Sequence, residues 1–566
     1  MGDVEQFDQV DAAEVAIPLD HLLNEAALGL SYRFRPRTAT LRLGLGLLKD
    51  PVNLVQRLGG LGTETLRVVV GRSEVAPDPR DRRFADPEWS ENPILRRVLQ
   101  SYLAAGKTTQ DLLADVELSY EDRERADFLI RNIIEGLAPS NSPILNPTAR
   151  KRLVESRGRS AAAGVKNFAS DMKSAPRVPS MVPADSFEVG KDLAITPGSV
   201  VFRNEMFELI QYRPTTDTVV RNPVLVVPPV INKYYAVDLA PGKSLIEYLV
   251  AQGLQPFVIS WRNPTAEHRD WGMDAYGAAI LDALRIAKRI TRAPKVNVYA
   301  ICSGGILAAM ALSHLQRTGQ LADVAGLSLA VTVLDQHHAG LASSALNRQT
   351  ADLAIAVSAA RGYLDGRNLA EAFAWLRPTD LIWNYWINNY LAGREPPKFD
   401  VLFWNADTTR MSAALHRDFV MNGVTNALAR QDEVTMLGTG VDLSALDVDG
   451  FVVAGVADHI CPWQAVYASA RLLGGHTEFV LSTSGHIASL INPPGNPKAR
   501  YLTGTPDVAD ADAWRRTAES REGSWWPDFA AWLTERGAGT KKAPRSLGNK
   551  DFPPLADAPG TYVMES

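Results

Sequence analysis

From residue 198 onward, short apolar segments alternate with helical patterns, and this alternation constrains the fold more than any other feature of the chain. Apolar segments of strand character lie at 222–231, 255–261, 296–301, 324–335, 449–458 and 477–483. Amphipathic helical patterns separate the early ones, at 243–253 and 274–291. Strands and helices that alternate in this way form a mostly parallel sheet with helices on both faces. We therefore predict an α/β fold for residues 196–566.

The chain is too long for one ordinary domain, with 566 residues. Residues 1–195 carry mainly helical and irregular patterns, which predict a separate N-terminal domain. A stretch rich in Ser, Pro and Ala between about 157 and 196 predicts the linker. Residues 336–440, rich in Trp, Tyr and Asn, interrupt the alternation between two predicted strands, and this position predicts an inserted lid.

The composition favours a folded protein of a reducing compartment. Hydrophobic residues make up 46% of the chain, enough for a large core. The net charge is −5 and there is no long basic run, which argues against nucleic acid as a partner. Two cysteines argue against a disulfide framework and favour the cytoplasm. We expect no membrane span, because no 18 consecutive residues are apolar, and no signal peptide, because the N-terminus is acidic.

The sequence VNVYAICSGGILAAMALSHL has the pattern of a nucleophile elbow, in which a strand turns sharply into a helix and exposes one side chain. Two adjacent residues, Cys302 and Ser303, are candidate nucleophiles. Small residues are needed two positions before and after the nucleophile, because the strand and helix backbones nearly touch there. Ala300 and Gly304 flank Cys302 in this way, whereas Ile301 would precede Ser303 and would clash. The steric argument therefore selects Cys302.

A thiol nucleophile needs a base, and the base needs an orienting group. The α/β-hydrolase fold places these groups in the order nucleophile, acid, histidine. Asp458, at the end of a predicted strand, and His486, after the next strand, match that order; the alternative role for Asp458 is a helix N-cap. Asp335, after the strand that follows the elbow, is the rival acid. His459 is expected to support the site, and Cys461 to contribute to packing.

Backbone N–H groups are expected to stabilise the oxyanion. One belongs to Ser303, which follows the nucleophile, and the other to Val230 or Ile231, in a loop that two prolines stiffen. The spacing of cysteines and histidines matches no common zinc or metalloprotease motif, so we predict no metal.

Several longer motifs together resemble the polyhydroxyalkanoate synthases, which polymerise hydroxyacyl-CoA into storage polyester. They include VPPVINKYYAVDLAPGKSL, AICSGG, RPTDLIWNYWINNYLAG, DHICPWQ and SGHIASLINPPGNPKAR. DPRDRRFADPEW and DSFEVGKDLA look closest to the single-subunit class II synthases. The resemblance implies that Cys302 holds the growing chain, that His486 is the base and that Asp458 is its acid partner. One position departs from the pattern: Ala300 stands where the family usually has glycine.

The resemblance also implies the partners. It implies (R)-3-hydroxyacyl-CoA as substrate, with coenzyme A released and no separate cofactor, and a homodimer at the surface of cytoplasmic polymer granules. The aromatic residues of the predicted lid would keep water from the acyl intermediate; they are Trp375, Trp383, Tyr385, Trp386, Tyr390 and Trp404. Two alternatives stay open: a cysteine-dependent esterase or thioesterase on the same fold, and a non-catalytic granule-coat protein.

Overall fold

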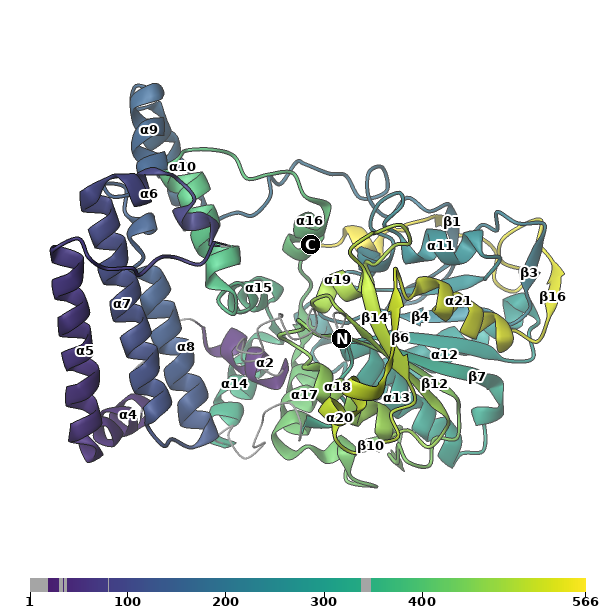
Figure 1. Ribbon diagram of the computed structural model, residues 1–566. Helices are drawn as coiled ribbons and strands as arrows, with labels where there is room; N and C mark the ends of the chain where they lie inside the picture. The colour runs from purple at the N-terminus through teal and green to yellow at the C-terminus, as the bar shows by residue number, and fades with distance from the viewer. Residues whose placement is uncertain (1–18, 30–33, 35–37, 80, 337–347) are drawn as a thin grey trace. The chain divides into compact units, whose positions relative to one another are not determined.

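The computed structural model describes residues 19–29, 34, 38–79, 81–336 and 348–566 (Figure 1). The first residues, on which the signal-peptide argument rests, and part of the predicted lid, 337–347, lie outside the described residues. Among the helices of the described residues, none combines the length and the apolar character needed to cross a bilayer.

Eleven strands of the described chain form one large sheet, in the order β15-β14-β13-β12-β7-β6-β4-β5-β2-β1-β17. Their bounds are β1 (Gly198–Arg203), β2 (Phe207–Tyr212), β4 (Val224–Val227), β5 (Pro256–Trp261), β6 (Val296–Ile301), β7 (Val324–Ala330), β12 (Gly450–Gly455), β13 (Thr477–Ser482), β14 (Arg500–Gly504), β15 (Glu519–Glu522) and β17 (Ala556–Asp557). The strands from β13 to β5 in this order pair in parallel, and those at both ends pair antiparallel. The predicted mostly parallel sheet is confirmed.

Helices cover the sheet as the alternation predicts (Figure 1). They include α11 (Leu245–Ala251), α12 (Met273–Thr291), α13 (Ser303–Arg317), α18 (Trp463–Arg471) and α21 (Trp526–Glu535). α11 and α21 pack together through Tyr248 and Trp526, whose ring centroids lie 5.5 Å apart, and α12 packs against α13. The strand order reverses direction between β4 and β6, and in such sheets ligands bind at the carboxyl ends of the strands beside this switch point. The predicted elbow follows β6, at this edge.

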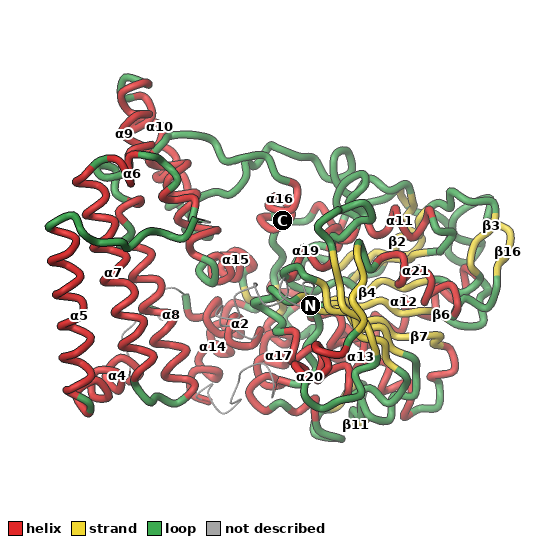
Figure 2. Tube along the Cα trace, viewed as in Figure 1, coloured by secondary structure: helices red, strands yellow, loops and turns green. Residues whose placement is uncertain are grey.

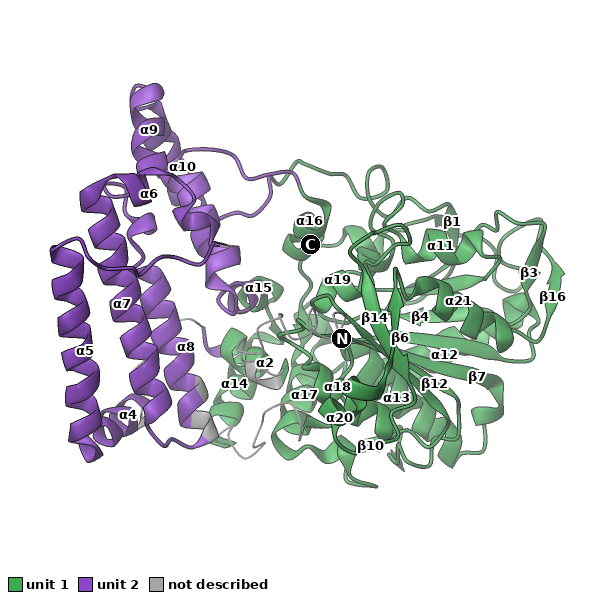
Figure 3. Ribbon diagram, in the orientation of Figure 1, with its two compact units in different colours: residues 1–27, 184–369, 399–566 green, residues 28–183, 370–398 purple. Residues whose placement is uncertain are grey.

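The chain forms two compact units (Figure 3). The sheet unit contains residues 1–27, 184–369 and 399–566, and the helical unit contains residues 28–183 and 370–398. Helices of the helical unit are α4 (Thr38–Lys49), α5 (Pro51–Val69), α7 (Pro93–Asp115), α8 (Tyr120–Gly136), α9 (Pro147–Glu155) and α10 (Arg159–Asp171). α10 occupies part of the predicted linker, because its first residues, RSAAAG, include three alanines, which are strong helix formers.

The segment predicted as a lid is helical in its described part (Figure 2). It contains α14 (Arg348–Arg361), α15 (Gly366–Ala374), α16 (Asp400–Ala406) and α17 (Ala413–Thr425), with π-helical turns at Thr379–Trp383 and Trp386–Leu391. Residues 370–398 pack with the N-terminal helices: Trp386 donates to the carbonyl of Asn141 at 3.1 Å, and Tyr390 donates to Asp171 at 2.7 Å. Most of the lid aromatics therefore lie half-buried in the helical unit, whereas Trp404 lies in the sheet unit.

Candidate active site

Cys302 occupies the sharp turn between β6 and α13. β6 ends at Ile301 and α13 begins at Ser303, so Cys302 alone joins strand to helix. Its backbone has φ 51° and ψ −122°, a conformation that residues other than glycine rarely adopt. Such strain persists where the surrounding structure enforces it, and it is typical of functional positions. The backbone therefore has the form expected of a nucleophile elbow.

The crowding at the elbow agrees with the steric argument that selected Cys302. A Cβ atom added to Gly304 would lie 2.3 Å from the carbonyl oxygen of Pro228 and 2.8 Å from that of Val227. Both contacts are with backbone, which cannot rotate away. Ala300, on the strand side, is completely buried. Position 304 thus admits no side chain without movement of the backbone, and position 300 is shielded from solvent.

Asp458 and His486 meet at the same edge of the sheet, after β12 and β13. Asp458 Oδ2 lies 2.7 Å from His486 Nδ1. Asp458 Oδ1 accepts the backbone N–H groups of Ile460 and Cys461, both at 2.9 Å. Each carboxylate oxygen is therefore occupied, and the acid is held rigidly behind the imidazole.

Asp335, the alternative acid, forms hydrogen bonds with other residues. Asp335 accepts a hydrogen bond from the side chain of Asn426 at 2.8 Å, and its backbone N–H donates to Ser469. Asp458 is also not the N-cap of α18, because Pro462 occupies that position. His459 is partly buried in the same turn as Asp458, and its supporting role stays a prediction.

The electrostatics of the site favour a thiolate–imidazolium pair. A hydrogen bond from the Cys461 thiol outweighs burial and, with the contact and charge of His486, lowers the pKa of Cys302 to about 5. Burial disfavours the charged imidazole, but the charge and hydrogen bond of Asp458, together with Cys302, raise the pKa of His486 to about 10. At neutral pH the proton therefore resides on His486 and the negative charge on Cys302.

Cys461 is the site residue that sequence reasoning missed. It is buried as predicted, but its thiol contacts Cys302 and is more than packing. Its sulfur, an oxygen of Asp458 and a ring nitrogen of His486 lie within 4.8 Å of one another, a grouping that also suits a metal ion. The hydrogen bonds that occupy Asp458 favour a triad over a metal site. The sequence offered one signal: Cys461 lies three residues after Asp458. An aspartate side chain often accepts the backbone N–H groups two and three residues later, and this forms a turn that folds the chain back.

The loop predicted to supply the second oxyanion donor lies beside the elbow. The Val230 N–H donates to Ser303 Oγ at 3.1 Å. This bond uses the Val230 N–H and does not involve that of the neighbouring Ile231. The Ser303 N–H lies in the first turn of α13, where backbone donors have no partner within the helix. Ser303 stays the predicted first donor, and the bond at Val230 favours Ile231 over Val230 as the predicted second donor.

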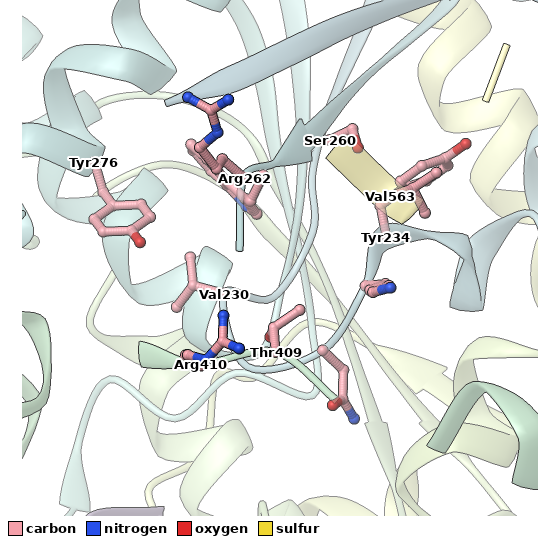
Figure 4. Close-up of a pocket in the computed structure, with 11 residues that line it drawn as sticks. Val230, Tyr234, Ser260, Arg262, Tyr276, Thr409, Arg410 and Val563 are labelled. Carbon is pink, nitrogen blue, oxygen red and sulfur yellow. The ribbon is translucent and has the colours of Figure 1, made fainter. Parts of the chain in front are cut away.

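Two residues of the inserted segment form hydrogen bonds with the same loop. Thr409 donates to the carbonyl of Ile231 at 2.6 Å, and Trp404 to that of Lys233 at 2.8 Å. Figure 4 shows Val230 with Thr409 and Arg410 around a small pocket. Three cations line this pocket: Lys233 lies 2.7 Å from Asp407, Arg262 lies 3.2 Å from Glu565, and Arg410 donates to an oxygen of Ser566 at 3.1 Å. The contacts of Thr409 and Trp404 support the loop.

A second small pocket opens on the nucleophile itself. Its lining is mostly aliphatic and comprises Leu19, Cys302, Ile306, Val331, Val333, Gln336, Ile460 and Cys461. Leu19 begins α2 (Leu19–Leu28), which packs in the sheet unit through a contact between the Leu23 carbonyl and the His416 ring. An apolar wall at the Cys302 sulfur is of the kind that contacts an acyl chain.

Comparison with known proteins identifies the family. Residues 80–249 match the family model described as the N-terminus of poly-beta-hydroxybutyrate polymerase (PhaC), and residues 237–493 match the alpha/beta hydrolase fold. The chain is 46% identical to poly(3-hydroxyalkanoate) polymerase 2 of Ectopseudomonas oleovorans, over 96% of both chains. The chain belongs to the poly(3-hydroxyalkanoate) polymerase family. The resemblance drawn from the motifs is confirmed, as is its class II character.

Further relatives of the polymerase family match over most of their length. Poly(3-hydroxyalkanoate) polymerase 1 of Ectopseudomonas oleovorans is 45% identical, over 92% of both chains. The polymerase subunit PhaC of Cupriavidus necator is 37% identical, over 87% of this chain and 84% of that one. The chain is thus a member of a family of acyl-transferring enzymes, and the α/β-hydrolase fold is confirmed.

Proposed function

We propose that the chain polymerises (R)-3-hydroxyacyl-CoA into polyhydroxyalkanoate and releases coenzyme A, through a thioester on Cys302. The observation that carries this proposal is the contact of the elbow thiol with the imidazole of His486, which Asp458 holds at 2.7 Å, in a chain of the polymerase family. We propose that the reaction needs no metal or separate cofactor, because coenzyme A arrives with the substrate.

In the first step, the Cys302 thiolate attacks the carbonyl carbon of the CoA thioester. The N–H groups of Ser303 and Ile231 stabilise the oxyanion that forms. The C–S bond to coenzyme A then breaks, and the departing sulfur takes the proton from His486. The products are acyl-Cys302, free coenzyme A and a neutral imidazole. A thioester is exchanged for a thioester, so the acyl group stays activated.

In the second step, neutral His486 accepts the proton of the 3-hydroxyl group of the next substrate. The hydroxyl oxygen attacks acyl-Cys302, an ester bond forms, and the thiolate leaves beside the restored imidazolium. The lengthened chain still carries its own CoA thioester and acylates Cys302 again. Both oxygens of Asp458 are occupied, so we assign the hydroxyl proton to His486 and an orienting role to Asp458.

This chemistry explains why the elbow carries a cysteine. An acyl group on serine would be an oxygen ester, about as stable as the polymer linkage, and its transfer to an alcohol would gain little free energy. A thioester makes the same transfer favourable. Water would compete with the alcohol, so we propose that residues 399–440, the part of the inserted segment that follows the helical unit, restrict its entry; the contacts of Trp404 and Thr409 with the oxyanion loop support this role.

We propose that the helical unit attaches the enzyme to the polymer surface in the cytoplasm, where the enzyme acts as a homodimer. Its helices α4 and α5 expose an apolar face, although α5 also packs against α7. The exposed side chains are Leu41, Leu45, Leu48, Val52, Val55, Leu58, Leu66, Val69 and Val70. A face of this extent is unusual on a monomer and suits an apolar surface such as that of the polyester.

The decisive experiment supplies 3-hydroxyacyl-CoA of increasing chain length and follows both coenzyme A release and product size. Polymer and release together support the synthase, and free acid without polymer identifies a thioesterase. Cys302→Ala should abolish polymer in cells that lack other synthases, while Cys461→Ala, the matched cysteine substitution, removes only the influence on the pKa of Cys302 and should still make polymer, at a lower rate. Polymer made by Cys302→Ala would point to a granule-coat protein instead.

The attachment proposal has a separate test. Replacing Leu41, Leu45, Val52 and Val55 with Gln should release the enzyme from isolated granules and leave the rate on soluble substrate intact. Exposed Leu153, Val154, Val165 and Phe168, on α9 and α10, provide the control: the variant with all four replaced by Gln should remain bound. Unchanged binding of the α4–α5 variant would place the attachment surface elsewhere.

A further inference from the structure

The two cysteines of the chain share one pocket, although they come from distant parts of the sequence. Cys302 lies at the end of β6, and Cys461 in the turn that follows β12. Both are nearly buried, at 7% and 4% exposure, and both line the apolar pocket with Ile306 and Ile460. The Cys461 sulfur lies within 4.8 Å of a ring nitrogen of His486, and hydrogen bonding by the Cys461 thiol lowers the pKa of Cys302. The geometry thus places a second thiol directly on the nucleophile.

The environment gives the two thiols opposite protonation states. Cys302 is a thiolate at neutral pH, as described above. The hydrogen bond with Cys302, burial and the negative charge of Cys302 raise the pKa of Cys461, which stays protonated. A thiolate is the form of cysteine that peroxides oxidise, and a neighbouring thiol is the usual partner that resolves the product. The pair therefore has one oxidisable member and one resolving member.

We propose that Cys302 and Cys461 form a reversible disulfide when the protein meets hydrogen peroxide, and that this bond switches off and protects the nucleophile. The Cys302 thiolate attacks one peroxide oxygen, the O–O bond breaks, and sulfenic acid and hydroxide form. The Cys461 sulfur then attacks the Cys302 sulfur, and the S–O bond breaks. The Cys461 proton leaves with the sulfenic oxygen as water. Two electrons pass from the sulfurs to the peroxide, and a dithiol returns them.

The surroundings favour an internal partner over a soluble one. Cys461 is held in a turn by its N–H bond to Asp458, and a turn can move its side chain more readily than a strand of the sheet. The pocket is small and mostly aliphatic, so it admits peroxide more easily than a charged tripeptide thiol such as glutathione. Without Cys461, sulfenic acid at Cys302 would meet further peroxide and advance to sulfinic or sulfonic acid, which simple thiols do not reduce.

The test treats the full-length protein with hydrogen peroxide and measures both activity and peptide masses. We expect a peptide that joins Cys302 to Cys461, with two hydrogen atoms lost, and activity that a dithiol restores. Cys461→Ser should gain two or three oxygens on Cys302 and should not recover. Cys461→Val is a second variant, in case serine disturbs the fold. The proposal is overturned if the natural protein gains oxygens on Cys302 without the cross-link, or if the variants recover equally.

This inference rests on the proposed function only in that the disulfide would block acylation of Cys302. The mass measurement needs no substrate and reports on the thiol pair alone. A cross-link in a protein that makes no polymer would therefore reject the proposed function and support the disulfide proposal. Polymer synthesis without a cross-link would support the proposed function and reject the disulfide proposal.

Discussion

The imidazole of His486 and the carboxylate of Asp458 form a buried pair, with Nδ1 and Oδ2 2.7 Å apart and the Asp458 side chain fully shielded from solvent. This bond occupies Nδ1 and leaves the other ring nitrogen of His486 free of Asp458. It also supplies the negative charge that keeps the imidazole protonated. Asp458 thus controls both the direction and the charge of the base, although it does not need to touch the substrate.

Replacing Asp458 with asparagine should therefore slow catalysis strongly. The amide is nearly the same shape, but it has no charge and can present its NH₂ group to Nδ1. We expect kcat for coenzyme A release to fall on the order of 100- to 10,000-fold, the range that general acid–base help supplies. Asp335→Asn is the matched control and should stay near the natural rate, because Asp335 contacts Asn426. Equal losses in both variants would contradict the assignment.

The pH dependence of alkylation should reveal the ion pair. The pKa of Cys302 is lowered to about 5, so its thiolate is present above that pH and is lost as the pH falls through it. The rate of reaction with iodoacetamide should be level near neutrality and should drop about tenfold per pH unit below the inflection. An inflection near the ordinary value of a free thiol, about 8.5, would contradict the ion pair.

Turnover should show a second limit at high pH. In the proposed mechanism the departing coenzyme A takes its proton from His486, whose pKa is raised to about 10. Coenzyme A release should therefore decline as the pH rises through that value, whereas alkylation should not. The comparison of the two profiles on one preparation separates the roles of the thiolate and the imidazolium.

The contribution of Cys461 to the nucleophile can be measured with the same assay. Its hydrogen bond is the largest influence that lowers the pKa of Cys302. Cys461→Ala removes the donor and should move the alkylation inflection to higher pH, while Cys461→Ser keeps a hydroxyl donor and should move it less. Identical inflections in both variants and in the natural protein would show that the hydrogen bond has no such effect.

The sequence was sufficient for the elements whose signals are local. The elbow follows from the small residues around Cys302, and the order of Asp458 and His486 follows from the strands that precede them. Cys461 was missed because its contact with Cys302 depends on a turn that Asp458 folds, and no periodicity records such a turn. Likewise, the aromatic pattern of 370–398 predicts burial but does not specify the partner, which proved to be the N-terminal helices.

Crowding at the elbow leads to a last prediction, which compares the two small residues around Cys302. A methyl group at position 304 would press on the carbonyl of Pro228, in the loop that carries Val230 and Ile231. Gly304→Ala should therefore lower the free energy of unfolding by about 1–3 kcal/mol and displace the oxyanion donors.

The matched variant at the other flank should be far milder. Ala300→Gly restores the residue usual in the family and leaves the loop in place, at a cost below about 1 kcal/mol from added backbone freedom. Urea denaturation gives the stabilities, and coenzyme A release gives kcat for both proteins. We expect Gly304→Ala to lose activity even under conditions where it is fully folded. If it kept the natural kcat, the contact between α13 and the loop at Pro228 would not position the oxyanion donors.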